Sequence, residues 1–420
     1  MLVFKFGGAS VKNADAVRNI VGILKDHKGE IIVVISAMGK TTNNLERIID
    51  HFVSNDKEAL DKEVNVLRDY HFEIINDLFD DKNHPVYSDI ESTFSDFGRE
   101  LAKQPSLSFD HDYDQIICFG ELLSTKIITH FLKSQNIKAE WKDVRYAIKT
   151  SNAYREARVN WEMTKELVPK HFQFEKNRIL VTQGFLGSTI DNITTTLGRE
   201  GSDYTGAVLA HVLKAKKLVI WKDVPGVLNA DPKWFDDTVL LDELSYRDAI
   251  ELAYYGASVI HPKTIKPLQN KNINLHVRSF KNPEAAGTVI SNVDYDKLVP
   301  SFIFKMDQVL IRISPKDFSF IAEDHLQTIF GILSENRVKI NLMQNSALKF
   351  SICVNNDKRK LPAIVDLLEN DFKVSYETGL ELITIRYFDE STIERVMINK
   401  DLILEHRDEK NIQLVVRDRG

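Results

Sequence analysis

The sequence predicts an α/β protein: a large domain built on a mainly parallel sheet, followed by a smaller region of short strands and helices. Three observations support this prediction. The chain has 420 residues, which is too long for one compact core. Strand-like and helix-like segments alternate through the longer, N-terminal part of the chain, as they do in parallel sheets covered by helices. Beyond Ser301 the segments shorten into two small units in tandem, the second weaker than the first.

The strands of the first region follow from apolar patterning. Residues 2–6 alternate as a strand and end at a sharp Gly7-Gly8 turn. The β-branched run 31–36 predicts a central, parallel strand. Residues 57–103 are charge-rich and helical with one apolar stripe, and we expect them to lie away from the sheet. Further strands are expected at 137–143, 178–183, 217–221 and 273–278, and helices at 17–24, 41–52 and 203–214.

A domain boundary is expected near residues 292–301, where a stretch rich in Lys and Asp carries Pro300. It separates a catalytic region, 1–290, from a regulatory region, 301–420, because tandem units of this size bind ligands more often than they catalyse. The first unit is expected to have strands at 309–314, 338–343 and 349–354 and helices at 323–335 and 361–369. The second is expected to have strands at 382–387, 401–406 and 411–417 and a helix at 391–398, and to be shortened, ending at Gly420 without a clear final helix.

Composition excludes several classes of protein. The chain is 43% hydrophobic and 28% charged, which is ordinary for a globular protein. A net charge of −6 favours neither a nucleic acid nor a membrane as partner. Cys118 and Cys353 share no metal-ligand spacing, so we expect reduced, buried thiols and no protein-bound metal centre. Since no secretory signal is visible and the longest apolar run is the strand Ile31–Ile35, a cytoplasmic location is expected.

Two loops near the N-terminus are candidates for binding phosphate. Lys5 lies on a strand that ends in Gly7-Gly8, and unshielded amides beside a lysine and a helix start suit a polyphosphate; the alternative is a simple tight turn. Gly39-Lys40-Thr41 resembles the end of a Walker A loop, but the required earlier glycine is Val34, so that interpretation fails. The hydroxyls of this loop, including Ser36 and Thr42, are either ligand contacts or helix caps.

The most informative segment is Thr194–Asp203, in which two glycines flank Arg199 and a helix follows. Arginine recognises a carboxylate through two parallel hydrogen bonds, and Asp203 suits an amino group. The alternative is a helix cap with a solvated arginine. Gly120–Ser124 places Glu121 beside a glycine, a weak signal alone. The polar turn Trp221–Val227 follows a strand, where ligands of open α/β sheets bind.

In this order the segments resemble the aspartate kinases of the amino acid kinase family. The matching patterns are K-F-G-G-x-S-V at Lys5–Val11, G-E-L-L-S at Gly120–Ser124, Q-G-F at Gln183–Phe185, T-T-T-L-G-R-x-G-S-D at Thr194–Asp203, W-x-D-V-x-G-V at Trp221–Val227, D-P at Asp231–Pro232 and G-A-x-V-I-H-P at Gly256–Pro262. The resemblance implies an amino acid kinase-like sheet sandwiched by helices, followed by ferredoxin-like βαββαβ ACT modules. It implies phosphoryl transfer from ATP, with Mg²⁺, to the β-carboxylate of L-aspartate, which begins lysine, threonine and methionine biosynthesis.

The resemblance also implies residue roles. Lys5, Asp203 and Arg199 would be catalytic. Residues at the nucleotide would be Lys5, Gly7, Gly8, Ser10, Ser36, Asp223, Leu228, Asp231 and Ser258, and those around aspartate Thr42, Glu121, Phe185, Arg199, Ser202 and Asp203. No general base is needed, because a carboxylate with a reference pKa of about 3.9 is already ionised at neutral pH. Catalysis is then expected to be positioning and electrostatics.

Three departures from the family pattern bear on the expected site. Ala9 replaces a threonine, and Glu200 replaces a glycine and brings a negative charge to the aspartate loop. Ser258 stands where the pattern carries a lysine for the nucleotide phosphates, so we expect Lys222 or Lys263 to take its place if the clamp is kept.

Assembly and regulation are expected from the ACT-like region. It implies a homodimer or a larger homo-oligomer. Asn341 and Ala347 replace the two acids of the lysine-binding pattern, which predicts weak or absent inhibition by lysine. Because the sequence ends at Gly420, a monofunctional kinase is expected. Two other functions stay open: another amino acid kinase, acting on glutamate or acetylglutamate, and a catalytically silent ligand-binding protein.

Overall fold

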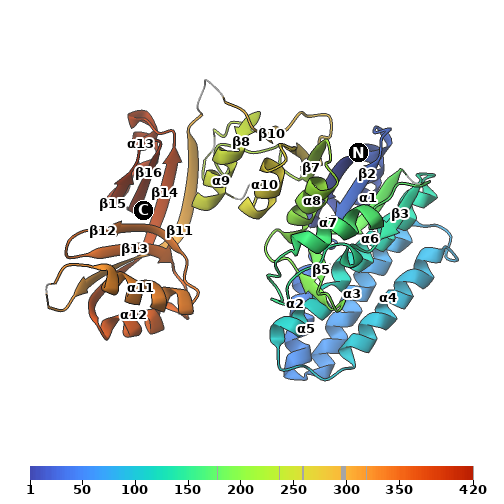
Figure 1. The fold of residues 1–420 in the computed structure, drawn as a ribbon, viewed down its shortest axis with the longest axis horizontal. Helices are drawn as coiled ribbons and strands as arrows, with labels where there is room; N and C mark the ends of the chain where they lie inside the picture. The colour runs from blue at the N-terminus through green and yellow to red at the C-terminus, as the bar shows by residue number, and fades with distance from the viewer. Residues whose placement is uncertain (177, 236, 258–259, 295–298, 318, 420) are drawn as a thin grey trace. The chain divides into compact units, whose positions relative to one another are not determined.

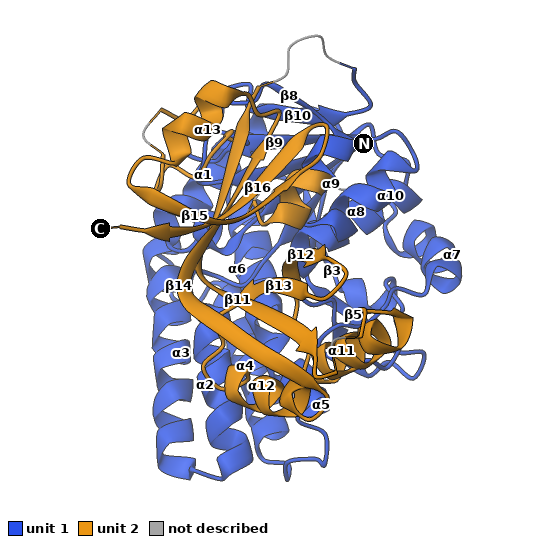
Figure 2. Ribbon diagram, turned by 90° about the vertical axis from the view of Figure 1, so that its left-hand side faces the viewer, with its two compact units in different colours: residues 1–227, 240–250, 259–294 blue, residues 228–239, 251–258, 295–420 orange. Residues whose placement is uncertain are grey.

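A computed structural model describes residues 1–176, 178–235, 237–257, 260–294, 299–317 and 319–419. The chain forms two compact units (Figure 2). The first comprises Met1–Val227, Leu240–Ile250 and Val259–Asp294, and the second comprises Leu228–Val239, Glu251–Ser258 and Tyr295–Gly420. Two short segments from the middle of the chain therefore belong to the C-terminal unit. The expected limits of the catalytic region, 1–290, remain a prediction.

Among the described residues of the first unit, eight strands form one sheet in the order β3-β4-β2-β1-β7-β9-β10-β8. Neighbours from β3 to β9 run parallel, and β10 is antiparallel to β9. The all-β-branched β2 (Ile31–Ile35) lies between β1 and β4 and is fully buried, which confirms the predicted central strand. The bounds are β1 Leu2–Phe6, β3 Ala139–Lys142, β4 Ile179–Gln183, β7 Lys217–Lys222, β8 Glu243–Ser245, β9 Asn274–Ser279 and β10 Thr288–Ser291.

Helices surround this sheet, and two of them, α3 and α4, extend away from it, as predicted (Figure 1). A small hairpin of β5 (Leu186–Ser188) and β6 (Thr194–Thr196), absent from the sequence-based prediction, precedes α8. None of the helices in the described ranges is long and apolar enough to cross a membrane. The helix bounds are α1 Ala14–Lys25, α2 Thr41–Ser54, α3 Lys57–Leu78, α4 Pro85–Leu101, α5 Phe109–Ile117, α6 Phe119–Ser134, α7 Trp161–His171, α8 Gly201–Val212, α9 Tyr246–Tyr255 and α10 Pro262–Gln269.

The described strands of the second unit form one antiparallel sheet in the order β12-β13-β11-β14-β16-β15. Its first half has the chain order β11-α11-β12-β13-α12-β14, which is the predicted βαββαβ module. The long strands β11 and β14 continue into the second half, so the two modules share one sheet. The bounds are β11 Ser301–Pro315, α11 Glu323–Glu335, β12 Ile340–Asn345, β13 Phe350–Asn355, α12 Leu361–Glu369, β14 Phe372–Arg386, α13 Glu390–Val396, β15 Lys400–Arg407 and β16 Asn411–Asp418.

The second module has one helix, α13, in the part of the chain that the structure describes. Ala230 and Phe235, from the segment Leu228–Val239, pack into the same buried cluster as Ile385 and Leu414 of its sheet. Burial of a large apolar side chain such as that of Phe235 stabilises by roughly 1.5–3 kcal/mol. The segment therefore helps to cover a sheet face that one helix leaves open.

Both cysteines are buried and unpaired, as predicted. Cys118 caps α5, and Cys353 lies on β13. Burial raises the pKa of each thiol to about 12, so both are unreactive at neutral pH.

Candidate active site

The centre of the candidate site is a buried ion pair between β1 and α8. Lys5 comes near the end of β1, and Asp203 lies in the first turn of α8. Lys5 Nζ is 2.7 Å from Asp203 Oδ1, and Lys222 Nζ, at the end of β7, is 4.0 Å from Asp203 Oδ2. An aspartate in the first turn also interacts favourably with the helix dipole. The structure thus brings together two of the residues predicted to be catalytic.

The Gly7-Gly8 turn lies directly against the loop that follows β2. Gly39 N–H donates to the Gly8 carbonyl at 3.0 Å. A Cβ on Gly8 would lie 2.9 Å from the Ala37 carbonyl oxygen, so only glycine fits there. A Cβ on Gly7 would lie 3.4 Å from Lys5 Nζ. Because glycine has no side chain, the space in front of the ammonium stays open. Unshielded backbone beside a cation is the surface that a phosphate group requires.

The start of α2 belongs to the same loop. The helix begins at Thr41, and its N-cap, Lys40, makes no side-chain hydrogen bond to the first turn. The first amides of a helix have no partner within the helix and carry a partial positive charge. Thr42, expected near the substrate, is half-buried in this turn. The loop therefore presents a helix N-terminus to the site even though it is not a Walker A loop.

Glu121 reaches the same loop from α6. A Cβ on Gly120 would lie 2.9 Å from Ala37 Cβ, so this glycine allows the close approach of α6. Glu121 Oε1 accepts a hydrogen bond from Ala37 N–H at 3.1 Å. Burial raises the pKa of Glu121 to about 8, and the hydrogen bonds and Lys5 offset this only in part. The carboxyl is therefore largely protonated at pH 7 when no further cation is near.

Phe185, in the turn after β4, has a strained backbone and packs against the start of α8. Its φ is 70°, a region that bulky residues rarely adopt, and its N–H donates to Thr205 Oγ1 at 2.9 Å. A Cβ on Gly184 would lie 2.4 Å from Ser202 Cβ, so glycine is required for this contact. The turn after β4 therefore packs tightly on the start of α8, where Ser202 and Asp203 lie.

Arg199 lies in an exposed loop between β6 and α8. Within the described ranges, its guanidinium has neither a hydrogen bond nor an ion pair. Gly198 before it has a φ of 74°, so the turn itself requires a left-handed residue. An exposed guanidinium on a sharply turned loop is available to a small carboxylate.

Asp114, on α5, supports this loop and was missed at the sequence level. Its carboxylate accepts hydrogen bonds from Arg155 N–H at 3.0 Å, from Thr196 N–H at 2.9 Å and from Thr196 Oγ1 at 2.7 Å. Burial raises the pKa of Asp114 to about 6. Nothing in the sequence distinguishes it from Asp110 and Asp112, because the feature that matters is its complete burial.

Two further residues predicted at the nucleotide lie beside this centre. The Ser10 hydroxyl is buried and donates to the Trp221 carbonyl at 3.4 Å, which links the glycine turn to β7. Ser36 is half-buried, and its N–H donates to the Phe6 carbonyl at 3.2 Å. Both residues therefore join neighbouring strand ends at the site.

The remaining nucleotide residues are not brought to this centre by the described contacts. Asp223 is exposed in the turn after β7. Leu228 and Asp231 belong to the second unit, where Asp231 Oδ1 accepts a hydrogen bond from Lys233 N–H at 2.9 Å. Ser258 lies outside the described residues. The predicted roles of these four residues remain predictions.

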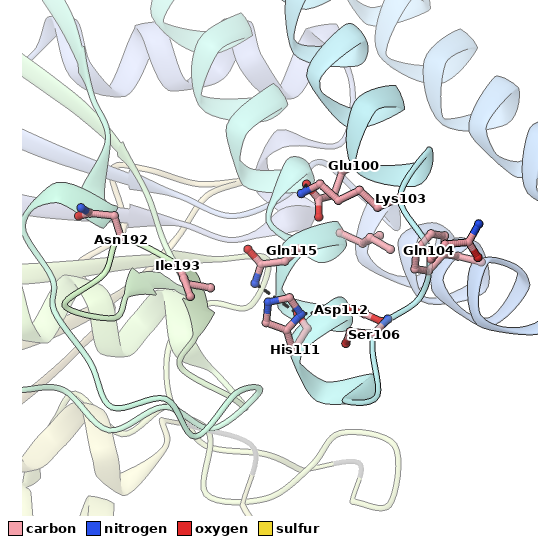
Figure 3. Close-up of a pocket in the computed structure, with 11 residues that line it drawn as sticks. Glu100, Lys103, Gln104, Ser106, His111, Asp112, Gln115, Asn192 and Ile193 are labelled. Atoms are coloured by element: carbon pink, nitrogen blue, oxygen red, sulfur yellow. Dashed lines mark hydrogen bonds and ion pairs between the residues drawn. The ribbon is translucent and has the colours of Figure 1, made fainter.

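A cavity of about 440 Å³ lies elsewhere in the first unit, between α5 and the β5–β6 turn. Figure 3 shows His111, Asp112 and Gln115 on one side and Asn192 and Ile193 on the other. The Asp112 carboxylate already accepts a hydrogen bond from Ser106 N–H and contacts His111. None of the predicted site residues lines this cavity, so it is distinct from the candidate site.

The chain resembles several characterised proteins. Residues 1–279 match the amino acid kinase family. The chain is 29% identical over 406 residues to the lysine-sensitive aspartokinase 3 of Escherichia coli strain K12, which covers 92% of this chain and 86% of that protein. It is also 29% identical over 391 residues to the chloroplastic bifunctional aspartokinase/homoserine dehydrogenase 2 of Arabidopsis thaliana, covering 90% of this chain but only 42% of that protein.

Solved structures show the same similarity to aspartokinases. The structure of E. coli aspartokinase III in complex with aspartate and ADP, in the R-state, superposes with a TM-score of 0.82 at 25% identity, covering 99% of this chain and 96% of that one. The T-state complex of the same enzyme with lysine and aspartate superposes with a TM-score of 0.80 at the same identity and coverage. The predicted fold class and resemblance are thereby confirmed. Since the family match spans more than half of its residues, the chain belongs to the amino acid kinase family.

Proposed function

We propose that this protein is an aspartate kinase, which transfers the γ-phosphoryl group of ATP to the β-carboxylate of L-aspartate and forms 4-phospho-L-aspartate. The observation that carries the proposal is the Lys5–Asp203 ion pair, 2.7 Å long, beside the Gly7-Gly8 turn. ATP binding is supported by the family and by the ADP complex of the E. coli relative. Mg²⁺ would enter with ATP as the substrate MgATP.

The nucleotide phosphates would lie at Gly7-Gly8 and the start of α2. Backbone amides, the N-terminus of α2 and Lys5 would together neutralise the polyphosphate. These groups are held in place before substrate arrives, because Gly8 is locked against Ala37 and Gly39. Preorganised charges of this kind stabilise a transition state without the cost of reorganising solvent.

Aspartate would bind between the Arg199 loop and α6. Arg199 would hold the α-carboxylate through two parallel hydrogen bonds, and Glu121 or Asp203 would hold the α-ammonium. The arriving ammonium would favour the ionised form of Glu121, whose pKa burial otherwise raises to about 8. Ser202, Thr42 and Phe185 would complete the pocket walls.

The reaction needs no proton transfer. An oxygen of the ionised β-carboxylate attacks the γ-phosphorus, the new carboxyl–phosphate bond forms, and the bond to the β–γ bridging oxygen breaks, leaving ADP. Lys5 would stabilise the charge that develops on the phosphoryl group and on ADP. The protein's contribution is to hold two anions within reacting distance of each other.

The remaining parts of the proposal concern the whole protein. We expect a homodimer or a larger homo-oligomer formed through the ACT-like sheet, a role in amino-acid biosynthesis, and a cytoplasmic location. The C-terminal unit would then act in assembly and in regulation.

One assay tests the reaction. The purified chain is incubated with MgATP and L-aspartate in the presence of hydroxylamine, and both ADP and the hydroxamate of the acyl phosphate are measured. L-Glutamate and N-acetylglutamate serve as alternative acceptors. Hydroxamate formation with aspartate alone is expected. Turnover of another acceptor in its place would assign a different amino acid kinase, and no turnover with any acceptor would point to a silent binding protein.

A further inference from the structure

The strand that leads to Arg199 is held at its end by the buried carboxylate of Asp114, on α5. Oδ2 of Asp114 accepts hydrogen bonds from Arg155 N–H at 3.0 Å and from Thr196 N–H at 2.9 Å, and Oδ1 accepts one from the Thr196 hydroxyl at 2.7 Å. Thr196 is the last residue of β6 and lies three positions before Arg199. Asp114 therefore fixes the backbone from which the Arg199 loop starts.

The same carboxylate fixes the segment against which this loop packs. A Cβ on Gly198 would lie 3.1 Å from the Arg155 carbonyl oxygen and 3.2 Å from Glu156 Cγ, so only glycine allows the loop to pass so closely. Arg155 itself has a φ of 66°, and its N–H is one of the donors to Asp114. Both sides of the turn before Arg199 thus depend on the position of Asp114.

The charge of Asp114 does not serve stability. In the described ranges no salt bridge reaches its carboxylate, because the Arg155 guanidinium pairs with Asp110 at 3.1 Å instead. Burial raises the pKa of Asp114 to about 6. Ionising this carboxyl therefore costs more in the folded chain than in the unfolded chain, so its charge opposes folding at pH 7. Groups that lower stability in this way are typical of functional sites.

We propose that Asp114 is a positioning residue for substrate binding, which acts through Arg199 by holding the turn at Gly198. This inference rests on the proposed function and extends it to a residue that touches neither substrate. A guanidinium makes two parallel hydrogen bonds to a carboxylate only when it is correctly directed. The side chain of Arg199 is exposed, so its direction depends on the backbone that Asp114 anchors.

The test compares two substitutions of Asp114. Asp114→Ala removes all three hydrogen bonds. Asp114→Asn keeps them, because its carboxamide oxygen accepts from the N–H groups of Arg155 and Thr196 while its NH₂ group donates to the Thr196 hydroxyl oxygen. Steady-state kinetics separate kcat and the two KM values. Hydrogen exchange of the peptide 194–199 in the ligand-free full chain gives a readout that is independent of turnover, and thermal unfolding checks that each variant is folded.

Asp112→Ala is the matched control. Asp112 is another buried aspartate on α5, two positions before Asp114. Its carboxylate accepts a hydrogen bond from Ser106 N–H at 2.7 Å, and within the described residues it has no hydrogen bond to β6. Asp112→Ala should therefore lower the Tm while leaving both KM values and the exchange of the peptide 194–199 like those of the wild type.

Asp114→Ala is expected to raise the KM for aspartate about tenfold, because a misdirected Arg199 loses its hydrogen bonds to the substrate. The KM for ATP should not change, and exchange of the peptide 194–199 should become faster. Asp114→Asn should keep the wild-type KM for aspartate without lowering the Tm, because it removes only the buried charge. When Arg199→Ala is already present, adding Asp114→Ala should raise the KM for aspartate no further.

Three kinetic results would overturn the inference. They are a wild-type KM for aspartate in folded Asp114→Ala, equal rises in both KM values, and an additive rise in the double variant, which would show that Asp114 acts independently of Arg199. If Asp114→Ala does not fold, Thr196→Val removes one of the three donors and should give a smaller rise in the KM for aspartate alone. No rise in that variant would equally contradict the proposal.

The exchange measurement separates this inference from the proposed function. If the wild type does not phosphorylate aspartate, the proposed function fails. Faster exchange of the peptide 194–199 in Asp114→Ala, but not in Asp114→Asn or Asp112→Ala, would then still show that Asp114 holds the Arg199 loop. Unchanged exchange in Asp114→Ala would show that it does not.

Discussion

The Glu200 carboxylate accepts a hydrogen bond from the backbone N–H of His261 at 2.8 Å. Glu200 precedes the first turn of α8, and His261 caps α10. The negative charge expected near the substrate carboxylates is thus directed to the N-terminus of another helix, where it is favourable. Glu200 joins the aspartate loop to the segment that carries the nucleotide-binding pattern of the family.

Substitution of Glu200 should separate this contact from backbone strain. Glu200 has a φ of 53°, a conformation that favours glycine. Glu200→Ala loses the hydrogen bond and keeps the strain, so we expect a loss of about 1–3 kcal/mol and a lower Tm. Glu200→Gly relieves the strain and should lose less. Thermal unfolding of the two variants checks which loses more stability. A Tm of Glu200→Gly below that of Glu200→Ala would contradict the prediction.

Removal of Lys5 should abolish turnover. Lys5→Ala takes away the cation next to the phosphates and leaves Asp203 buried without its closest partner. Both effects act in the same direction, and lost electrostatic contacts of this type cost about 3–4 kcal/mol in the transition state. Lys12→Ala, at an exposed lysine nearby, is the matched control. Activity like that of the wild type in a folded Lys5→Ala protein would remove Lys5 from the mechanism.

Arg199 should act on aspartate rather than on ATP. Arg199→Ala is expected to raise the KM for aspartate at least tenfold while changing the KM for ATP little, because only aspartate offers it a carboxylate. Arg199→Lys should recover little, since a point charge cannot make two parallel hydrogen bonds. Arg99→Ala, at an exposed site on α4, is the control. Equal rises in both KM values would show that Arg199 supports folding instead.

The affinity for aspartate should depend on pH through Glu121. The raised pKa of about 8 means that the free enzyme holds a proton on Glu121 below that pH, and the substrate ammonium requires the ionised form. The KM for aspartate should therefore fall as the pH rises from 6.5 to 8.5. Glu121→Gln has no group to titrate and should give a high, nearly constant KM. A wild-type KM for aspartate that does not change between pH 6.5 and 8.5 would exclude this role of Glu121.

Inhibition by lysine should be weak. Asn341, which replaces an acid of the lysine-binding pattern, is buried and donates to Gln308 Oε1 and Asn355 Oδ1, each at 2.8 Å. Its own Oδ1 accepts a hydrogen bond from Lys305 Nζ at 2.8 Å, so an internal ammonium already occupies this group. Asn341 therefore offers no negatively charged acceptor to the ammonium group of a free amino acid.

Titration of lysine, threonine and methionine against the initial rate checks this expectation. Asn341→Asp should not create inhibition, because the new carboxylate would pair with Lys305. Half-maximal inhibition of the wild type by micromolar lysine would show the prediction to be wrong.

Much of the fold could be predicted from the apolar periodicity of the sequence. The helices at Glu323–Glu335 and Leu361–Glu369 were predicted with the correct bounds because their apolar stripes and ends are clear. The first part of β14, from Phe372, was missed. Its side chains from Lys373 to Gly379 are exposed or half-exposed, and pairing with β11 holds it in place. The β5–β6 hairpin was missed for a different reason: its residues are all buried, but each strand has only three residues, which is too short to show a strand pattern.

The sequence by itself determined which residues belong to the family's motifs, because a motif is defined by residue types and their spacing along the chain. Only the tertiary structure decided how their charges combine. The distances from Asp203 to Lys5 and Lys222, the burial of Asp114 and Glu121, and the direction of Glu200 depend on segments far apart in the chain. Electrostatic energies vary with distance and burial, and both are properties of the packed fold.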